Sequence, residues 1–252
     1  MLGQPLRLPA RTGASPAPTP RYREDTHQTV KETDLLILGA GPAGLSAALH
    51  LLQLDPCWAG RMLVLEKAAH PRPKLCGGGV TRLGLDVLAG LGLPTPLPLP
   101  HAPVHEARLV YGRRAIIVRG NPAFVVYHRQ EFDAYLAAQA RARGAAIHEN
   151  EPVQNIQVER DGVVVTTPRG EYRARAVIGA DGSTGPTRRV VEAARPVSRP
   201  SPVARLLEVI APAPPGAALF TERQALFDFT PAQNALQGYT WDFPARVAGA
   251  PH

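Results

Sequence analysis

A glycine-rich segment, Gly39-Ala40-Gly41-Pro42-Ala43-Gly44, has the residue types and the spacing of a loop that binds a dinucleotide. In such a loop the first glycine allows a tight turn, the second lets the backbone approach a pyrophosphate, and the third lets a helix pack closely on a strand. The free N–H groups and the dipole of the following helix would face the phosphates. We therefore expect Gly39, Gly41, Ala43 and Gly44 to bind a dinucleotide cofactor.

A carboxylate follows the glycine loop at the distance that the dinucleotide pattern requires, about twenty residues. Glu66 can accept hydrogen bonds from both ribose hydroxyls of an adenosine, and its charge would repel a 2′-phosphate, which argues against NADP here. Its neighbour Lys67 is a further candidate for contact with the cofactor. The alternative interpretation of the same pattern is a structural βαβ unit with a solvated glutamate.

These residues require a strand, a helix and a second strand, and the flanking sequence predicts all three. Residues 35–38 form a short continuous apolar run, which is typical of a buried parallel strand. Residues 42–54 predict a helix with its leucines on one face, and residues 62–65 predict the second strand. Residues 34–66 are therefore expected to form a βαβ unit.

The rest of the chain predicts helices and short strands in alternation. Helices are expected at residues 81–91 and 129–143, the second ending where Gly144 can serve as a C-cap. Strands are expected at residues 104–111, 114–119, 124–127, 146–148, 153–159, 162–167, 172–178, 203–210, 219–229 and 236–243. The Asp161-Gly162 pair predicts a hairpin, and the proline-rich residues 93–103 predict an extended connection.

Composition excludes several classes of function. The net charge is +7, but the basic residues form no stripe, so we expect no nucleic-acid partner and relate the bias to an anionic cofactor. No window offers the roughly 20 apolar residues of a membrane span. The two cysteines, Cys57 and Cys76, form no disulfide framework and favour a reducing, cytoplasmic compartment. We expect no metal site.

Residues 175–182, an apolar strand that runs into Gly-Ala-Asp-Gly, resemble the second flavin motif of the para-hydroxybenzoate hydroxylase superfamily. The resemblance implies FAD as the cofactor, with Asp181 and Gly182 at its pyrophosphate–ribityl part. Arg129, in a segment similar to the helix start that touches the flavin cofactor, is then a further contact, and a diphosphate would balance its charge. Val153 is implied beside the adenine. This chain departs from the superfamily at Gly185-Pro186-Thr187, which intervene before the expected arginine.

Two further segments, residues 71–80 with Pro-x-x-Lys-x-Cys-Gly-Gly-Gly and residues 238–244 with Tyr-x-Trp-x-Phe-Pro, resemble the geranylgeranyl reductase family. Cys76, Gly77 and Gly78 are then candidates to line the flavin edge, where bare N–H groups stabilise negative charge on the reduced ring. Cys76 is also the candidate catalytic residue, as the group that positions the substrate, with a small buried hydrophobe as the alternative. The alternating Tyr239, Trp241 and Phe243 would wall an apolar substrate cavity or belong to a core.

The resemblance implies an α/β fold: a Rossmann-like FAD-binding domain at residues 33–103 and 129–190, with an inserted and appended antiparallel β substrate domain at residues 104–128 and 200–252. It implies an FAD-dependent oxidoreductase that reduces C=C bonds of a prenyl substrate, with NADPH or a ferredoxin-like carrier as reductant. Peripheral membrane contact through that substrate is an additional expectation. Residues 1–32 predict a disordered tail, with a targeting segment or a misplaced start as alternatives.

Other functions stay open beside the reductase. The aromatic motif also resembles the Trp-x-Trp-x-Ile-Pro of flavin halogenases, so a halogenase or monooxygenase of the same fold is the first alternative. An inactive fragment with partial FAD-binding elements is the second. The superfamily closes its flavin site with Gly-Asp-Ala, and this chain has no Gly-Asp dipeptide. We therefore expect a fold incomplete at the C-terminus, or completed by a separate chain, with weak FAD binding and poor turnover.

Overall fold

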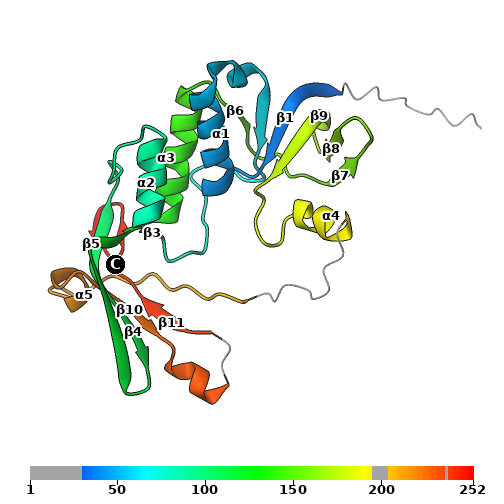
Figure 1. The fold of residues 1–252 in the computed structure, drawn as a ribbon. Helices are drawn as coiled ribbons and strands as arrows, with labels where there is room; N and C mark the ends of the chain where they lie inside the picture. The colour runs from blue at the N-terminus through cyan, green and yellow to red at the C-terminus, as the bar shows by residue number, and fades with distance from the viewer. Residues whose placement is uncertain (1–29, 195–203, 236–237) are drawn as a thin grey trace, which may run out of the picture.

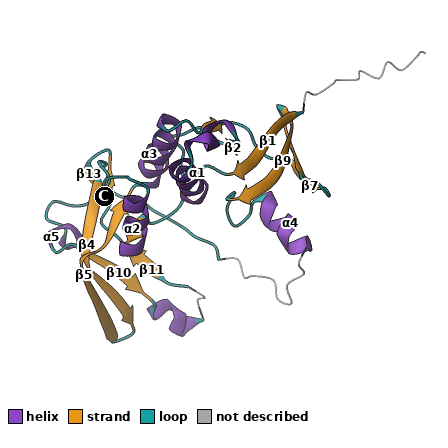
Figure 2. Cartoon of the chain, turned by 45° about the horizontal axis from the view of Figure 1, so that its top comes forward, coloured by secondary structure: helices purple, strands orange, loops and turns teal. Residues whose placement is uncertain are grey.

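The chain folds around two β-sheets with helices between them (Figure 1). The computed structural model describes residues 30–194, 204–235 and 238–252. In Figure 1 the first sheet lies at the upper right and the second at the lower left, and Figure 2 separates their strands from the helices by colour. One core cluster runs from β1 of the first sheet through the helices to the end of β5 in the second sheet. The two sheets are therefore joined by continuous apolar packing.

The first sheet has the strand order β6-β2-β1-β9-β8-β7. Its strands are β1 (Lys31–Leu38), β2 (Met62–Leu65), β6 (Ala146–His148), β7 (Asn155–Val158), β8 (Val163–Thr167) and β9 (Gly170–Gly179). The four strands β6, β2, β1 and β9 are parallel, and β8 and β7 add an antiparallel edge. β1 leads to β2 on one side and pairs with β9 on the other, so a crevice for ligands is expected at its carboxyl end.

β1 is buried on both faces, which explains its unbroken apolar run. Ile37 packs in the core shared with helices α1 (Pro42–Leu54) and α3 (Arg129–Ala142), whereas Leu36 and Leu38 pack in the cluster on the opposite face. α1 and β2 have the bounds that periodicity predicts, and α3 ends one residue earlier than expected. The βαβ prediction for residues 34–66 is confirmed.

The second sheet has the strand order β11-β10-β4-β5-β3. Its strands are β3 (Gly79–Thr81), β4 (His101–Tyr111), β5 (Arg114–Tyr127), β10 (Gln224–Asp228) and β11 (Thr240–Asp242). It is antiparallel except for the β4–β10 pair, which is parallel. The remaining elements are η1 (Pro56–Gly60), α2 (Arg82–Gly90), α4 (Pro186–Ala194), α5 (Ala218–Thr221), η2 (Thr230–Asn234) and a small hairpin of β12 (Arg246–Val247) and β13 (Ala250–Pro251).

Several predicted boundaries were wrong. β1 begins at Lys31, inside the expected tail, because Lys31 and Glu32 pair with β9; residues 1–29 lie outside the described residues. Residues 114–127 form one strand that includes Pro122, where two strands were expected. Residues 204–210 carry no strand, and residues 218–221 are helical. Apolar runs of this length do not distinguish a strand from a helix or an extended connection.

The predicted domain limits stay a prediction, but strand pairing refines them. β3 was assigned to the nucleotide-binding part, and it pairs with β5 in the second sheet instead. The segment after Glu66 therefore crosses from the first sheet to the second within about a dozen residues, and it carries parts of both candidate sites. None of the helices in the described ranges is both long and apolar enough to cross a membrane.

Candidate cofactor site and apolar pocket

The glycine loop is held tightly between the carboxyl ends of three strands. Gly39 has φ +104°, its N–H donates to Leu65 O at 2.8 Å, and a Cβ there would collide with the Ala180 carbonyl oxygen. A Cβ on Gly44 would collide with the carbonyl oxygen of Gly39. Both glycines are therefore required by close backbone packing, as predicted.

Gly41 differs from the other two glycines because the space beside it is open. A Cβ placed on Gly41 would meet only Arg72 Nη2, at 3.5 Å. Gly41 is also the N-cap of α1, whose first-turn N–H groups lack partners within the helix. The opening is therefore where an anion can approach the backbone and the helix start, with Ala43 in the first turn.

Glu66 follows β2, as predicted, and is 4% exposed. Its carboxylate accepts from Ala40 N–H at 2.8 Å, from Ala68 N–H at 3.2 Å and from Arg72 Nη2 at 3.3 Å. Lys67 is exposed beside it. The carboxylate thus holds the glycine loop directly, a structural task that adds to the ribose contact expected for it.

A buried ion cluster next to the glycine loop was not foreseen from the sequence. Asp133 on α3 is 0% exposed and accepts from Arg129 Nε at 2.7 Å and Nη2 at 2.9 Å. Arg72 Nη1 lies 3.4 Å from the same carboxylate, so Arg72 bridges Asp133 and Glu66. Burial works against the charge of Arg129, but the Asp133 carboxylate outweighs it and raises the pKa of the guanidinium. Asp133 therefore balances the charge of Arg129 in this structure, and the contact of Arg129 with the cofactor stays a prediction.

Arg72 is the loosest member of this cluster. Its contacts of 3.3 and 3.4 Å are longer than those that Ala40 and Arg129 make to the same carboxylates. Its Nε is buried and has no acceptor among the described residues. A sequence signal existed, because Arg72 lies inside the quoted Pro-x-x-Lys-x-Cys segment, but nothing in that pattern says where its side chain points.

Asp181 and Gly182 lie at the carboxyl end of β9, across from the glycine loop. A cavity of about 490 Å³ is lined by Ala43 of α1, by residues 179–182 and by α4. The Asp181 carboxylate accepts from Thr187 N–H at 2.9 Å and from Thr187 Oγ1 at 2.6 Å, and so caps α4. The departure at Gly185-Pro186-Thr187 therefore forms this helix start. Val153 packs partly buried against the second core cluster of the first sheet.

The triple glycine and the aromatic motif meet in one apolar pocket of about 400 Å³. A Cβ on Gly77 would lie 2.9 Å from both Phe243 Cε2 and Trp241 Nε1, so the two segments are in direct contact. The pocket is lined by Leu75, Cys76, Gly77, Gly78, Gly79, Thr81, Phe124, Leu206, Phe227, Tyr239, Trp241 and Phe243. The prediction that the three alternating aromatic residues share one face is confirmed, whereas their contact with a substrate stays a prediction.

Cys76 lies at the boundary between the ion cluster and the apolar pocket. Its thiol lies beside the guanidinium of Arg129, and its N–H donates to Glu208 Oε2 at 3.0 Å. Gly78, with φ +72°, packs against the Tyr127 carbonyl, where a side chain would collide. The Cys76–Gly79 segment therefore forms the wall between the two candidate sites.

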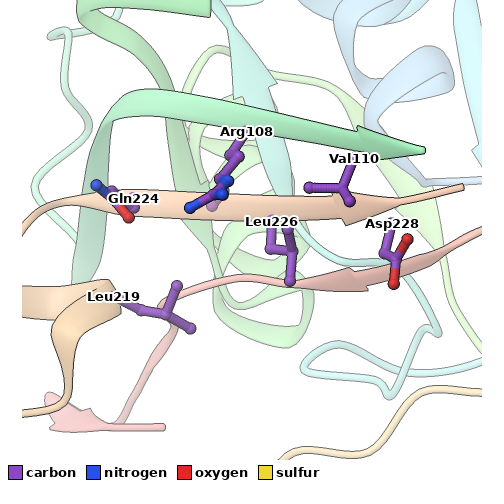
Figure 3. A pocket seen from close by; sticks show the side chains of 7 residues that line it. Arg108, Val110, Leu219, Gln224, Leu226 and Asp228 are labelled. Atoms are coloured by element: carbon purple, nitrogen blue, oxygen red, sulfur yellow. The ribbon is translucent and has the colours of Figure 1, made fainter. Parts of the chain in front are cut away.

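The outer face of the second sheet carries a separate cavity of about 300 Å³ (Figure 3). It is lined from β4 by Arg108 and Val110, from β10 by Gln224, Ala225, Leu226 and Asp228, and from α5 by Leu219. Figure 3 shows Arg108 between Gln224 and Leu226 along the two strands. None of the predicted site residues lies in this cavity.

Comparison with known proteins shows which family the chain belongs to. A family model described as an FAD binding domain matches residues 32–247 of the chain. The chain therefore belongs to this FAD-binding family, and the prediction of an FAD-dependent oxidoreductase is supported at that level. The match to an FAD binding domain supports FAD rather than NAD as the cofactor, a choice that the glycine loop alone left open.

Three proteins illustrate what the chain is similar to. Digeranylgeranylglycerophospholipid reductase 2 of Methanosphaera stadtmanae is 31% identical over 166 residues, covering 60% of this chain and 39% of that protein. A geranylgeranyl bacteriochlorophyll reductase-like structure from Thermoplasma acidophilum shares the fold, with TM-score 0.62, 22% identity and coverage of 88% and 55%. A flavin-dependent halogenase structure gives TM-score 0.53, 28% identity and coverage of 66% and 32%. The resemblance to the geranylgeranyl reductase family is confirmed, and the chain spans well under two thirds of each of these proteins.

The residues on the glycine-loop side fit a bound FAD. The Arg72 guanidinium borders the open space over Gly41 through Nη2, 3.5 Å from the position of a Cβ there, and its Nε is buried without an acceptor among the described residues. A diphosphate there would provide oxygen acceptors for the guanidinium and for the free N–H groups of α1. The cavity of about 490 Å³ with Ala43 and Asp181 in its lining lies beside the same helix start.

Proposed function

We propose that the chain is the FAD-binding part of a reductase that acts on the C=C bonds of a long prenyl substrate. The observation that supports the proposal is the contact of Gly77 with Trp241 and Phe243 in an apolar pocket, while the neighbouring Cys76 lies beside Arg129 of the ion cluster. In this arrangement one short segment, Cys76–Gly79, would face both ligands.

The cofactor would be held mainly by backbone and by charge. Gly39, Gly41 and Gly44 shape the loop and α1 begins at it, so Glu66 would face the ribose and Arg72 the diphosphate. Asp181 and Gly182 would face the ribityl part, and Cys76 to Gly78 the flavin edge. When bound and reduced, FAD supplies hydride chemistry, and the protein supplies binding, orientation and electrostatics.

The pocket supports an apolar and elongated substrate. Its lining is dominated by aromatic rings that pack against one another, with ring centroids 5.0 Å apart for Phe227 and Phe243 and 6.5 Å apart for Trp241 and Phe243. Tyr239, 44% exposed, stands at the solvent side. Apolar walls with few polar groups suit a hydrocarbon chain, because burial of such surface is favourable without directional partners.

A flavin-dependent halogenase or monooxygenase is the second candidate. The halogenase structure is 28% identical over the matched segment, a level similar to that of the curated reductase. Anaerobic reduction of the FAD-loaded chain with dithionite separates the two. We expect a prenyl lipid to reoxidise the flavin without oxygen and to lose a C=C bond by mass spectrometry. A flavin that stays reduced when the prenyl lipid is added without oxygen, or a halogenated product once oxygen and halide are supplied, would overturn the reductase proposal.

The remaining partners follow from the same proposal. NADPH or a ferredoxin-like carrier would deliver electrons, and the substrate would bring the protein to a membrane surface. A separate chain that completes the flavin site is a further partner. Each is tested by adding it to the FAD-loaded chain: NADPH or reduced ferredoxin must bleach the flavin, and prenyl-lipid vesicles must co-sediment with the protein.

A further inference from the structure

The His70 ring lies beside the glycine loop, and each of its two nitrogens contacts an oxygen atom. Its side chain is 3% exposed. Nδ1 lies 2.7 Å from Glu149 Oε1, and Nε2 lies 3.0 Å from the carbonyl oxygen of Ala40. The backbone N–H of His70 donates to the same Glu149 oxygen at 3.1 Å, so the ring is fixed in place from both sides.

Both partners of the ring are acceptors. A peptide carbonyl has no proton to donate, and a carboxylate accepts only while it is ionised. Burial opposes the ionisation of Glu149, but hydrogen bonds from Arg141 and His70 outweigh burial and hold its pKa at about 2. Glu149 is thus an anion at neutral pH. Both ring nitrogens must therefore donate, and only the imidazolium carries two N–H groups.

We propose that His70 is a doubly protonated positioning residue that orients the phosphate-binding peptide of the glycine loop. The Ala40 carbonyl and the Gly41 N–H belong to one planar trans peptide, in which the two groups point in opposite directions. Since His70 draws the carbonyl oxygen to one side, the Gly41 N–H is directed to the other. This is an assignment for His70 that rests on the proposed FAD site.

The same peptide segment is held at its other end by Glu66. The Ala40 N–H donates to Glu66 Oε2 at 2.8 Å, while the Ala40 carbonyl accepts from His70. Ala40 is thus fixed through both of its backbone groups. An imidazolium also polarises the peptide that it binds, which strengthens the Gly41 N–H as a donor to an anion.

The charged groups around His70 come from several elements. Glu149 follows β6, Arg141 on α3 lies 2.8 Å from Glu149 Oε1, and Glu66 and Arg72 lie on the far side of Ala40. Loss of one ring proton leaves His70 a single donor, and the shorter bond to the Glu149 carboxylate keeps it. The bond to Ala40 is then lost, so the orientation of the Ala40–Gly41 peptide depends on the second ring proton.

Nuclear magnetic resonance of the FAD-free chain tests the proposal without any cofactor. We expect the His70 ring, identified by its loss in His70→Gln, to carry protons on both nitrogens at pH 7. The Gly41 amide signal must shift in His70→Gln and must stay in place in His50→Gln. A singly protonated ring at pH 7, or a Gly41 signal unaffected by His70→Gln, would overturn the proposal.

FAD affinity at pH 7 provides the second readout. We expect His70→Gln to bind FAD about five-fold more weakly than the wild type, the equivalent of one hydrogen bond. His50→Gln, the same change at an exposed position of α1, should keep the wild-type affinity. Wild-type affinity in His70→Gln contradicts the proposal, whereas absent FAD binding in the wild type contradicts the proposed function and leaves the resonance test decisive.

Discussion

The glycine-loop end of the first sheet and the aromatic pocket of the second sheet are built from different parts of the chain. The first site consists of backbone groups and buried charges, with Glu66 and Asp133 each accepting several hydrogen bonds. The second consists of aromatic rings and glycines, with side chains in direct van der Waals contact. The first therefore depends on conformation and charge balance, and the second on shape.

The two faces of the second sheet show a similar contrast. On the inner face, Phe227 of β10 packs against the rings of Phe124 and Phe243. On the outer face, Arg108 and Asp228 line a shallow cavity together with aliphatic residues (Figure 3). Because residues of a strand alternate between faces, the same two strands support an aromatic pocket on one side and a mixed polar surface on the other.

The largest effect is expected where the backbone of the glycine loop is most crowded. Gly44→Ala places a Cβ against the Gly39 carbonyl, so α1 must move away from β1. We expect a loss of about 3 kcal/mol or more in the free energy of unfolding, together with loss of FAD binding. Urea denaturation and flavin fluorescence measure the two effects.

Gly60→Ala is the matched control, because a Cβ on Gly60 would meet nothing within 4 Å. We expect that variant to unfold within about 0.5 kcal/mol of the wild type. Equal stability of Gly44→Ala and Gly60→Ala would show that the loop adjusts, and that its conformation is not what distinguishes the cofactor site.

The second-largest effect on stability is expected from charge balance in the buried ion cluster. Asp133→Asn leaves Arg129 and Arg72 with one carboxylate fewer in a buried site, and we expect about 3 kcal/mol of destabilisation. Asp86→Asn removes the acid of the exposed Arg82–Asp86 pair, which has the same i,i+4 spacing, and should change stability by less than about 1 kcal/mol. Thermal unfolding of both variants measures the difference in stability. Similar melting temperatures would contradict the claim that the buried ion cluster stabilises the fold.

A third effect, near the glycine loop, is expected in the pH dependence of stability. Folding lowers the pKa of Glu149 from 4.5 to about 2, so its stabilisation is complete above pH 4.5 and is lost as the pH falls to 2. We expect Glu149→Gln to lose about 2 kcal/mol at pH 7, discounted for partial exposure. Urea denaturation as a function of pH should show that the free energy of unfolding falls less steeply between pH 4.5 and pH 2 in the variant. An equally steep fall would mean that other groups cause the acid destabilisation.

The smallest effect is expected in the aromatic pocket, where shape rather than charge decides. Trp241→Leu removes apolar surface, and we expect about ten-fold weaker binding of a prenyl substrate, or about 1.4 kcal/mol, with FAD affinity unchanged. Leu226→Ala, on the outer face, should leave substrate binding unaltered. If Trp241→Leu weakened FAD and substrate equally, the two sites would not be separable.

Local patterns predicted much of the first sheet. The bounds of α1 and β2 follow from apolar periodicity, and the Asp161-Gly162 hairpin follows from its turn residues. Patterns were less reliable in the second sheet, where Pro122 continues a strand and an apolar run at residues 204–210 is extended without pairing. Short runs of this kind are decided by their neighbours in space.

The sequence by itself determined which residues are candidates to bear the chemistry: the glycine loop, Glu66, the triple glycine and the aromatic motif. Only the tertiary structure decided that Gly77 touches Trp241 and Phe243, far away in the chain. It also decided that Arg72 bridges Glu66 and Asp133, and that His70 joins Ala40 to Glu149. A glycine spacing encodes local backbone conformation, whereas a buried ion cluster depends on which strands and helices meet, and that is set by packing of the whole chain.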